Sequence, residues 1–498
     1  MFRGRLRKGL HPSVVRHITE PYLRAARVEL PHHLDIHRAH VIMLAEQQIL
    51  TREEAGKILE GLSEMDRTDI YAGEMDVGTD LYMNVEEQLI RRVGDVGGKM
   101  HIGRSRNDLY ATSVRMETRK QILMTAAQLL DLLRVVLSIA EVHAETVMPG
   151  YTHWQHAQPV TLGHYLAGIA QALGRDLGRL LAAYDRTNCC PLGAAALATT
   201  GFEINRERVA SLLGFDRVLE NSYDAVASRD FLAEVAAALA ILMTTLSRLA
   251  EDLAIWNTFE FSVVRMPEEF AATSSIMPQK KNPIVLEHIK GRAGHVIGAL
   301  TSVLAVLKGT SFSHSRETGG ETSGGVQAAF GLVQGCVEML TELFPRLSFD
   351  GELMRRRAWE GFSTVTELAD LLVRRGGVSF RQAHHIIGQV VNELMDKSQG
   401  VGELSSAMID QAARAVVGRG FLLPQEEVRR ALDPLATVMA RDICGGPGSR
   451  AMAAAIEAQR EALERAGEKL SSLAQGLERA RAACREAQSP LTSGIGRG

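Results

Sequence analysis

Apolar side chains recur every three or four residues along several long segments of this chain, which is the spacing of one face of an α-helix. The pattern predicts helices around residues 123–140, 162–181 and 230–257, and a fourth helix that follows Pro283. Strand-like alternation is scarce, and aromatic residues make up only 5% of the chain. Long helices with leucine- and alanine-rich faces pack together as bundles. We therefore expect an all-α protein with a long-helix bundle whose apolar faces continue into partner subunits of a homo-oligomer.

The lengths of the predicted elements divide the chain into three parts. Residues 1–107 form a mixed or helical N-terminal domain of shorter elements, and residues 108–360 hold the long helices of a central bundle domain. Residues 361–498 form a small helical C-terminal domain that ends in a polar, frayed tail. A length of 498 residues fits about three domains.

Composition argues against several classes of partner. The 56 basic and 59 acidic residues are interspersed, so the net charge is −3, and neither a nucleic acid nor a membrane is expected to bind. No charge-free stretch reaches the roughly 20 residues of a membrane span, and the basic N-terminus lacks the apolar run of a signal peptide. Five sparsely placed cysteines are typical of reduced thiols. We expect a cytoplasmic protein.

No cofactor is expected either. The sequence contains no nucleotide-binding loop and no redox-cofactor pattern, and no cysteines are paired at metal-ligand spacing. The histidines at positions 32, 33, 37 and 40 have no clustered carboxylates or thiolates beside them, so no metal site is expected there.

Three polar stretches interrupt the hydrophobic chain near the ends of its long helices. The first, residues 274–283, holds two serines, two lysines and Asn282. Asn282 is predicted to cap the following helix, with Pro283 as its first residue. The free N–H groups and the dipole of such a helix start form a seat for an anion. A capped surface loop without function is the alternative.

The second polar stretch, residues 98–108, precedes the first long helix. Arg104 and Arg106 carry planar guanidinium groups suited to carboxylates, and Asn107 or Asp108 is a candidate cap for the helix. A solvated charged turn is the alternative here.

The third polar stretch spans residues 148–159. Pro149 is expected to end one helix and Thr152 to cap the next. His153 is a candidate acid or base, although a single histidine is more often structural.

Together the three stretches resemble the fumarase/aspartase superfamily. Its signature loop, Gly-Ser-Ser-x-Met-Pro-x-Lys-x-Asn-Pro, is present at 274–283 with Thr273 in place of the glycine. The motifs HxGRSRND at 101–108, YTHxQxAQP at 151–159, SRDF at 228–231 and FRQAHHIIG at 380–388 are similar to argininosuccinate lyases in particular. The resemblance covers about residues 30–470.

The resemblance implies an all-helical homotetramer with a central multi-helix core and with active sites built from three subunits. It also implies a carbon–nitrogen lyase that eliminates an amine from an N-substituted aspartate and releases fumarate. Negative charge accumulates on one carboxylate during this reaction, so its stabilisation is the main task of the site.

The resemblance also assigns roles to residues of this chain. Ser274 is the base, and Lys280 and Asn282 hold the carboxylate that gains charge. His153 is the proton donor to the departing amine, and Glu287 is its partner. The residues implied in binding the rest of the substrate are Ser105, Arg106, Asn107, Thr152, Gln155, Arg229 and His314.

The chain departs from this family on the side of the leaving amine. A tyrosine, a glutamine and a lysine of the family are replaced by His314, Gly319 and Thr322, and the family's Asp-Ile-His is Asp80-Leu81-Tyr82 here. Losing such partners changes substrate preference strongly. The fumarate half of the site is intact and the amine half is altered.

Three interpretations follow. The first is an argininosuccinate lyase that releases fumarate and arginine. The second is the same chemistry on another N-substituted aspartate, such as an aminopolycarboxylate of the ethylenediamine-disuccinate kind. The third is a non-catalytic structural protein resembling a lens crystallin, which the intact Ser274, Lys280 and His153 disfavour.

Overall fold

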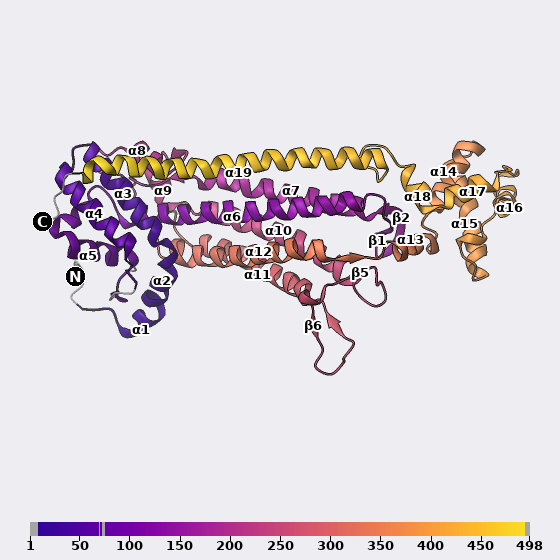
Figure 1. Ribbon diagram of the computed structural model, residues 1–498, viewed down its shortest axis with the longest axis horizontal. Coiled ribbons are helices and arrows are strands. Elements are labelled where there is room, and N and C mark those ends of the chain that lie inside the picture. Colours follow the sequence, from indigo (N-terminus) through magenta and orange to yellow (C-terminus); the bar gives the residue numbers. More distant parts are fainter. Residues whose placement is uncertain (1–7, 69, 72–74, 494–498) are drawn as a thin grey trace.

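Helices dominate the computed structural model, which describes residues 8–68, 70–71 and 75–493. Six long helices form an elongated bundle, with a smaller helical group at each end (Figure 1). The bundle consists of α6 (Arg106–Val142), α7 (Leu162–Thr187), α10 (Asp230–Trp256), α11 (Ile284–Leu307), α12 (Thr322–Leu343) and α19 (Ser449–Thr492). This architecture confirms the predicted all-α, long-helix fold.

The end groups and connections are built from short elements. The N-terminal group holds α1 (Pro12–Val14), α2 (Glu20–Ala25), α3 (Leu30–Glu46), α4 (Arg52–Arg67) and α5 (Leu81–Val93), with α8 (Arg206–Leu212) and α9 (Ser222–Ala227) beside it. The opposite end holds α13 (Gly351–Glu360), α14 (Val365–Gly376), α15 (Phe380–Asp396), α16 (Ser406–Val417), α17 (Gln425–Leu432) and α18 (Pro434–Met439).

The strands are short and form four two-stranded pairs among the described residues. The antiparallel pairs are β1 (Val147–Thr152) with β2 (Gln155–Thr161), β5 (Val264–Arg265) with β8 (Ser348–Phe349), and β6 (Ala272–Thr273) with β7 (Lys281–Asn282). The parallel pair is β3 (Cys189–Cys190) with β4 (Arg217–Val218).

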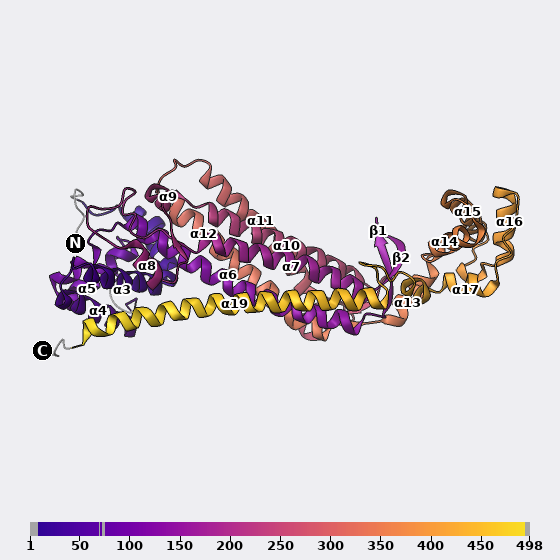
Figure 2. The same cartoon turned by 90° about the horizontal axis from the view of Figure 1, so that it is seen from above.

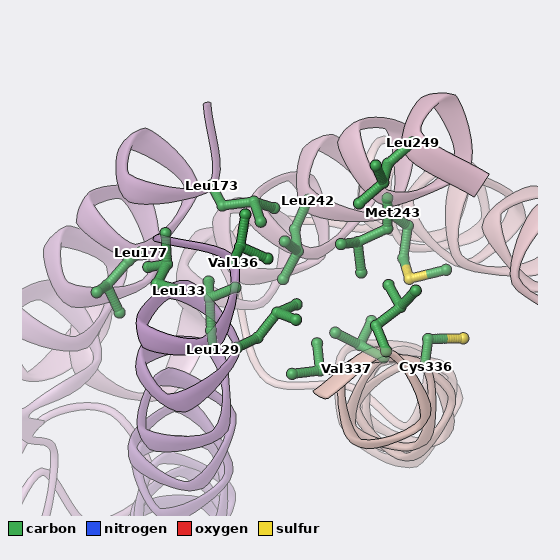
Figure 3. Close-up of a cluster of buried hydrophobic side chains, with 14 of the residues drawn as sticks. Leu129, Leu133, Val136, Leu173, Leu177, Leu242, Met243, Leu249, Cys336 and Val337 are labelled. Atoms are coloured by element: carbon green, nitrogen blue, oxygen red, sulfur yellow. The ribbon is translucent and has the colours of Figure 1, made fainter. Parts of the chain in front are cut away.

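The bundle core comes from the apolar faces that the sequence pattern indicates. Leu133 of α6, Leu173 of α7 and Leu242 of α10 point toward one another, and Val337 of α12 closes the cluster (Figure 3). All four side chains are buried. Burying one such side chain stabilises the fold by about 1.5–3 kcal/mol, so the interlocking faces hold the helices side by side over their whole length.

Two of the bundle helices, α12 and α19, are absent from the sequence-based prediction. Helix α12 carries several glycines, which lower its helix propensity and interrupt the apolar periodicity in its sequence. Helix α19 is mostly polar, and only Ala451, Met452, Ile456 and Leu470 along it are buried. It runs back along the bundle to the N-terminal group (Figure 2). The expected polar tail is therefore helical as far as Thr492, and residues 494–498 lie outside the described part of the chain.

One helix end and two helix starts differ from the prediction. Pro149 does not end a helix and Thr152 does not cap one, because residues 147–161 pair as a hairpin and Thr161 caps α7. Asn282 does not cap α11 either. Its backbone is held in β7 opposite Ala272, and α11 begins without a side-chain cap.

Separate hydrophobic clusters lie in the bundle, in the N-terminal group and around α14–α17. We propose domain boundaries near residues 107 and 360. Helix α19 crosses this division, since it follows residue 360 in the sequence but packs along α6, α7 and α4.

Helices α6 and α10 are long and apolar enough to cross a membrane by length and composition alone. Half or slightly more of their most apolar windows is buried inside the bundle, 50% and 56% respectively. The buried part of these windows belongs to the bundle core, where both helices contribute leucines to one cluster.

Candidate active site

The start of α6 presents the second polar stretch at the N-terminal end of the bundle. Ser105 caps the helix by accepting a hydrogen bond from the Asn107 amide, and Asp108 completes a capping box by accepting one from the Ser105 amide. The Arg106 guanidinium donates to the Asp80 carboxylate over 2.6 Å, and the Asn107 side-chain amide donates to the Ala196 carbonyl over 3.1 Å. The α6 start thus gathers charge and N–H donors, as an anion site requires.

Arg229 and His314 lie near this helix start and line one small pocket together with Tyr22, Glu29 and Arg316. Arg229 is buried, and its Nε atom has no hydrogen-bond partner among the described residues. The pKa of His314 is lowered to about 4, mainly by burial and to a smaller extent by the nearby cations Arg229 and Arg316. His314 is therefore neutral at physiological pH, and the positive charge of this pocket comes from its arginines.

A hairpin at the opposite end of the bundle carries the third polar stretch. Thr152 and Gln155 are paired across β1 and β2, and His153 and Trp154 form the two-residue turn between them. Both turn residues have positive φ angles, 53° and 61°, a conformation that such turns usually give to asparagine or glycine. Trp154 is 65% exposed. The hairpin thus holds His153 outward at some conformational cost.

The serine loop projects from the side of the bundle between β6 and β7 (Figure 1). The Ser274 hydroxyl accepts hydrogen bonds from the backbone amides of Ile276 and Met277, over 3.3 and 3.0 Å. The Lys280 ammonium donates to the Asn282 side-chain oxygen, which leaves the Asn282 NH₂ group free to donate elsewhere. The loop therefore presents a hydroxyl, an ammonium and an amide together.

The α6 start and the β1–β2 hairpin are far apart within one chain. Helix α6 contains 37 residues, so at about 1.5 Å per residue it separates Asn107 from the β1–β2 hairpin by roughly 55 Å. Within the described residues no hydrogen bond or ion pair links His153 to Glu287, which is exposed on the first turn of α11. A single chain therefore brings together Ser105, Arg106, Asn107, Arg229 and His314, but neither the hairpin residues nor the serine loop.

Several residues beside the α6 start escaped the sequence analysis as site residues. Asp80 caps α5 and holds Arg106, and the Arg316 guanidinium lies 3.9 Å from the same carboxylate. Tyr22 lies under Arg316, with 6.0 Å between the guanidinium carbon and the ring centroid. Of these residues, the sequence had pointed only to Asp80, as part of the altered family motif Asp80-Leu81-Tyr82.

The histidines at positions 32, 33, 37 and 40 lie buried along α3. Across the described part of the chain, no group of three or more His, Cys, Asp or Glu side chains is arranged to hold a metal ion.

Comparison with known proteins identifies the family. A family model described as "Lyase" matches residues 36–298, and one described as "Argininosuccinate lyase C-terminal" matches residues 362–439. The argininosuccinate lyase of Methanocaldococcus jannaschii is 40% identical over 93% of this chain and 94% of that protein. Argininosuccinate lyase 1 of Shouchella clausii is 38% identical over 96% of each.

A solved structure agrees with these sequence matches. The crystal structure of an EDDS lyase in complex with formate superposes with a TM-score of 0.88, at 36% identity over 97% of this chain and 96% of the other. Both the sequence matches and the fold extend over nearly the whole molecule. The chain therefore belongs to the fumarase/aspartase superfamily and, within it, to the argininosuccinate lyase family.

Proposed function

We propose that this protein is a carbon–nitrogen lyase that eliminates arginine from argininosuccinate and releases fumarate. The observation that carries the proposal is the identity of about 40% to argininosuccinate lyases over more than nine-tenths of the chain. The non-catalytic alternative is set aside, because the family is one of lyases. The substrate reaches the site as a small molecule, and a cytoplasmic location fits the five free cysteines.

Ser274 acts as the base that removes the proton beside the substrate carboxylate. A serine hydroxyl is a weak base unless its oxyanion is stabilised. The amides of Ile276 and Met277 already point at the Ser274 oxygen and would stabilise that oxyanion as it forms. This arrangement supports the assignment that the resemblance suggests.

Lys280 and Asn282 bind the carboxylate on which negative charge accumulates. The Lys280 ammonium donates a hydrogen bond to the Asn282 side-chain oxygen, so the two side chains are already held side by side before substrate binds. Preorganised donors of this kind supply several kcal/mol of transition-state stabilisation. Thr152, Asn107, Ser105, Arg106 and Gln155 bind the remaining fumarate carboxylate, and His153, with Glu287 beside it, protonates the leaving amine.

The complete site forms in a homotetramer, where three subunits each contribute one polar stretch. The roughly 55 Å that separate Asn107 from the hairpin support a site that is shared between subunits. Helix α11 also leaves Ile297 and Leu304 about half exposed, and it carries Gly291, Gly294 and Gly298. A side chain added at any of these glycines would meet nothing within its own chain, so their small size suits close packing of a partner helix.

A second candidate substrate is an aminopolycarboxylate of the kind on which EDDS lyase acts. Two observations favour it. The superposition on EDDS lyase is close over nearly the whole chain. His314, Gly319 and Thr322 also replace a tyrosine, a glutamine and a lysine of the argininosuccinate lyase family, so the pocket for the amine differs from the family's. Arg229, which would bind a carboxylate of the amine, serves either substrate.

The experiment that tests the proposal is a parallel assay for released fumarate by ultraviolet absorbance. Argininosuccinate, ethylenediamine-disuccinate and simple N-alkyl aspartates are offered to the purified protein at equal concentrations. Fast release from argininosuccinate supports the first substrate, and release only from an aminopolycarboxylate supports the second. Release from none of them overturns the proposal.

A further inference from the structure

We propose that Asp108 is a positioning residue, whose carboxylate clamps the loop 191–200 onto the start of α6 and thereby fixes the side chain of Asn107 for substrate. The proposal rests on the lyase function proposed above, because it concerns the same site. Asp108 itself is fully buried and reaches no substrate.

The Asp108 carboxylate joins two segments that are 85 or more residues apart in the sequence. One oxygen accepts the backbone amide of Ser105, at the start of its own helix, over 3.1 Å. The other oxygen accepts the amides of Gly193 and Ala195, over 3.0 and 2.9 Å. Three N–H donors to a buried carboxylate form a strong anchor, because hydrogen bonds to an ionised group are about twice as strong as neutral ones.

The loop needs such an anchor because its backbone is strained. Ala195 and Thr199 have φ angles of 50° and 59°, in the left-handed region that residues with a side chain rarely adopt. For Thr199 this is a marked outlier, since its side chain is β-branched. Strain of this kind persists only where surrounding contacts hold it, and it gathers at functional sites. The hydrogen bond from its amide to Asp108 holds Ala195 directly.

The same loop orients Asn107. The Ala196 carbonyl, one residue past the clamped amide, accepts a hydrogen bond from the Asn107 side chain over 3.1 Å. This bond fixes the plane of the amide and leaves its second N–H free to donate to a carboxylate. Asp108 thus acts on substrate binding through the loop and Asn107. A displacement of about 1 Å at such a donor can lower the rate by roughly 100-fold.

The test is a double-mutant cycle between Asp108→Asn and Asn107→Ala in the full-length protein, with kcat/KM measured on whichever substrate the wild type turns over. The asparagine side chain has nearly the same shape as the aspartate. However, its NH₂ group cannot accept a hydrogen bond, so at least one of the backbone amides that bind Asp108 loses its acceptor and the clamp is broken. We expect kcat/KM to fall about 30- to 100-fold in the single variant. In the Asn107→Ala background the same change should cost less than about threefold, since the group being positioned is gone.

The pH profile separates positioning from a general loss of stability. Burial raises the pKa of Asp108 to about 7, with Arg104 and the three amides acting in the opposite direction. Arg206 and Cys190 also face this carboxylate. The Asp108→Asn variant resembles the protonated wild type, so the ratio of wild-type to variant kcat/KM should approach one well below pH 7 and reach its maximum above it.

Thr112→Val is the matched control, because Thr112 is equally buried one turn along α6 and its hydroxyl donates to the Asp108 backbone carbonyl rather than to the carboxylate. It should lower the melting temperature without changing the pH profile of kcat/KM. Additive losses in the double-mutant cycle, or a ratio independent of pH, overturn the role of Asp108. A wild type that releases fumarate from no substrate refutes the proposed lyase function instead, and the Asn107 geometry is then tested by fumarate binding to the same variants.

Discussion

The Ser274 hydroxyl oxygen lies 3.0 Å from the backbone nitrogen of Met277, inside the loop that carries it. A hydroxyl held by backbone N–H groups is poised to become an oxyanion, because those donors strengthen as charge develops. The loop also stands clear of the bundle, so its contribution to folding is small (Figure 1).

Replacing Ser274 with alanine should therefore remove catalysis and leave the fold intact. We expect kcat to fall by at least about 1,000-fold, since the reaction loses its base, while the oligomer size and melting temperature stay unchanged. Fumarate release, analytical ultracentrifugation and thermal unfolding measure these three properties. A variant that keeps more than a tenth of the wild-type kcat would show that Ser274 is not the base.

A second prediction concerns the sharing of sites between subunits. Ser274→Ala should be inactive alone and Asn107→Ala should keep only a small, measurable part of the wild-type activity, because each removes a different contribution to every site. Mixed oligomers, formed by denaturing and refolding the two variants together, should recover a substantial fraction of activity. The recovery follows from the proposed sharing of each site between subunits, which lets a hybrid assemble some sites from intact segments only. A mixture as inactive as its components would place each site within one chain.

A third prediction concerns acid stability. Burial, with Arg104 and His32 nearby, lowers the pKa of His33 to about 3, and burial with Arg104 and Arg106 does the same for the pKa of His101. In the unfolded chain these histidines titrate near pH 6.5, so the unfolded state binds protons first and stability falls as the pH drops from about 6.5 toward 3. Glu29 has the opposite sign, because burial raises its pKa to about 7.

A histidine variant isolates this contribution. Between about pH 6.5 and 5, the melting temperature of His33→Leu should fall less than that of the wild type. The reason is that both ring nitrogens of His33 are buried without hydrogen-bond partners in the part of the chain that the structure describes. His384→Leu, on an exposed face of α15, is the control and should follow the wild type. Equal acid sensitivity in all three proteins would contradict the assignment.

A fourth prediction concerns the leaving amine. His314 lines the pocket with Arg229 and is neutral at physiological pH, because its pKa is lowered to about 4. His314→Tyr should place a phenol donor where argininosuccinate lyases carry one, and raise kcat/KM for argininosuccinate relative to an aminopolycarboxylate about tenfold, the value of one hydrogen bond. Both substrates are measured on the same preparation. An unchanged ratio would mean that selection of the amine occurs elsewhere.

The fold was predictable where burial is regular. Leu133, Leu173 and Leu242 repeat at helical spacing because each faces the same core, and that spacing predicted their helices. Helix α19 was missed because it lies on the surface of the bundle with few buried positions. The hairpin at 147–161 was missed because Pro149 was interpreted as the end of a helix, whereas it is tolerated in a strand beside a bulge.

The site was predictable only as separate motifs. Ser274, Lys280 and Asn282 stand within nine residues, so their grouping is visible in the sequence. The link from Asp108 to Gly193 and Ala195 is not visible, because it depends on tertiary contacts between segments with no shared pattern. For the same reason the sequence did not show that Arg316 lies close to Asp80.

The decisive measurement is the steady-state rate of fumarate release from argininosuccinate by the wild-type protein. We expect a kcat/KM of at least about 10⁴ M⁻¹s⁻¹, within the ordinary range of enzymes, with arginine formed in equal amount. No fumarate from argininosuccinate under conditions where the oligomer is intact, whatever happens with other N-substituted aspartates, would contradict it.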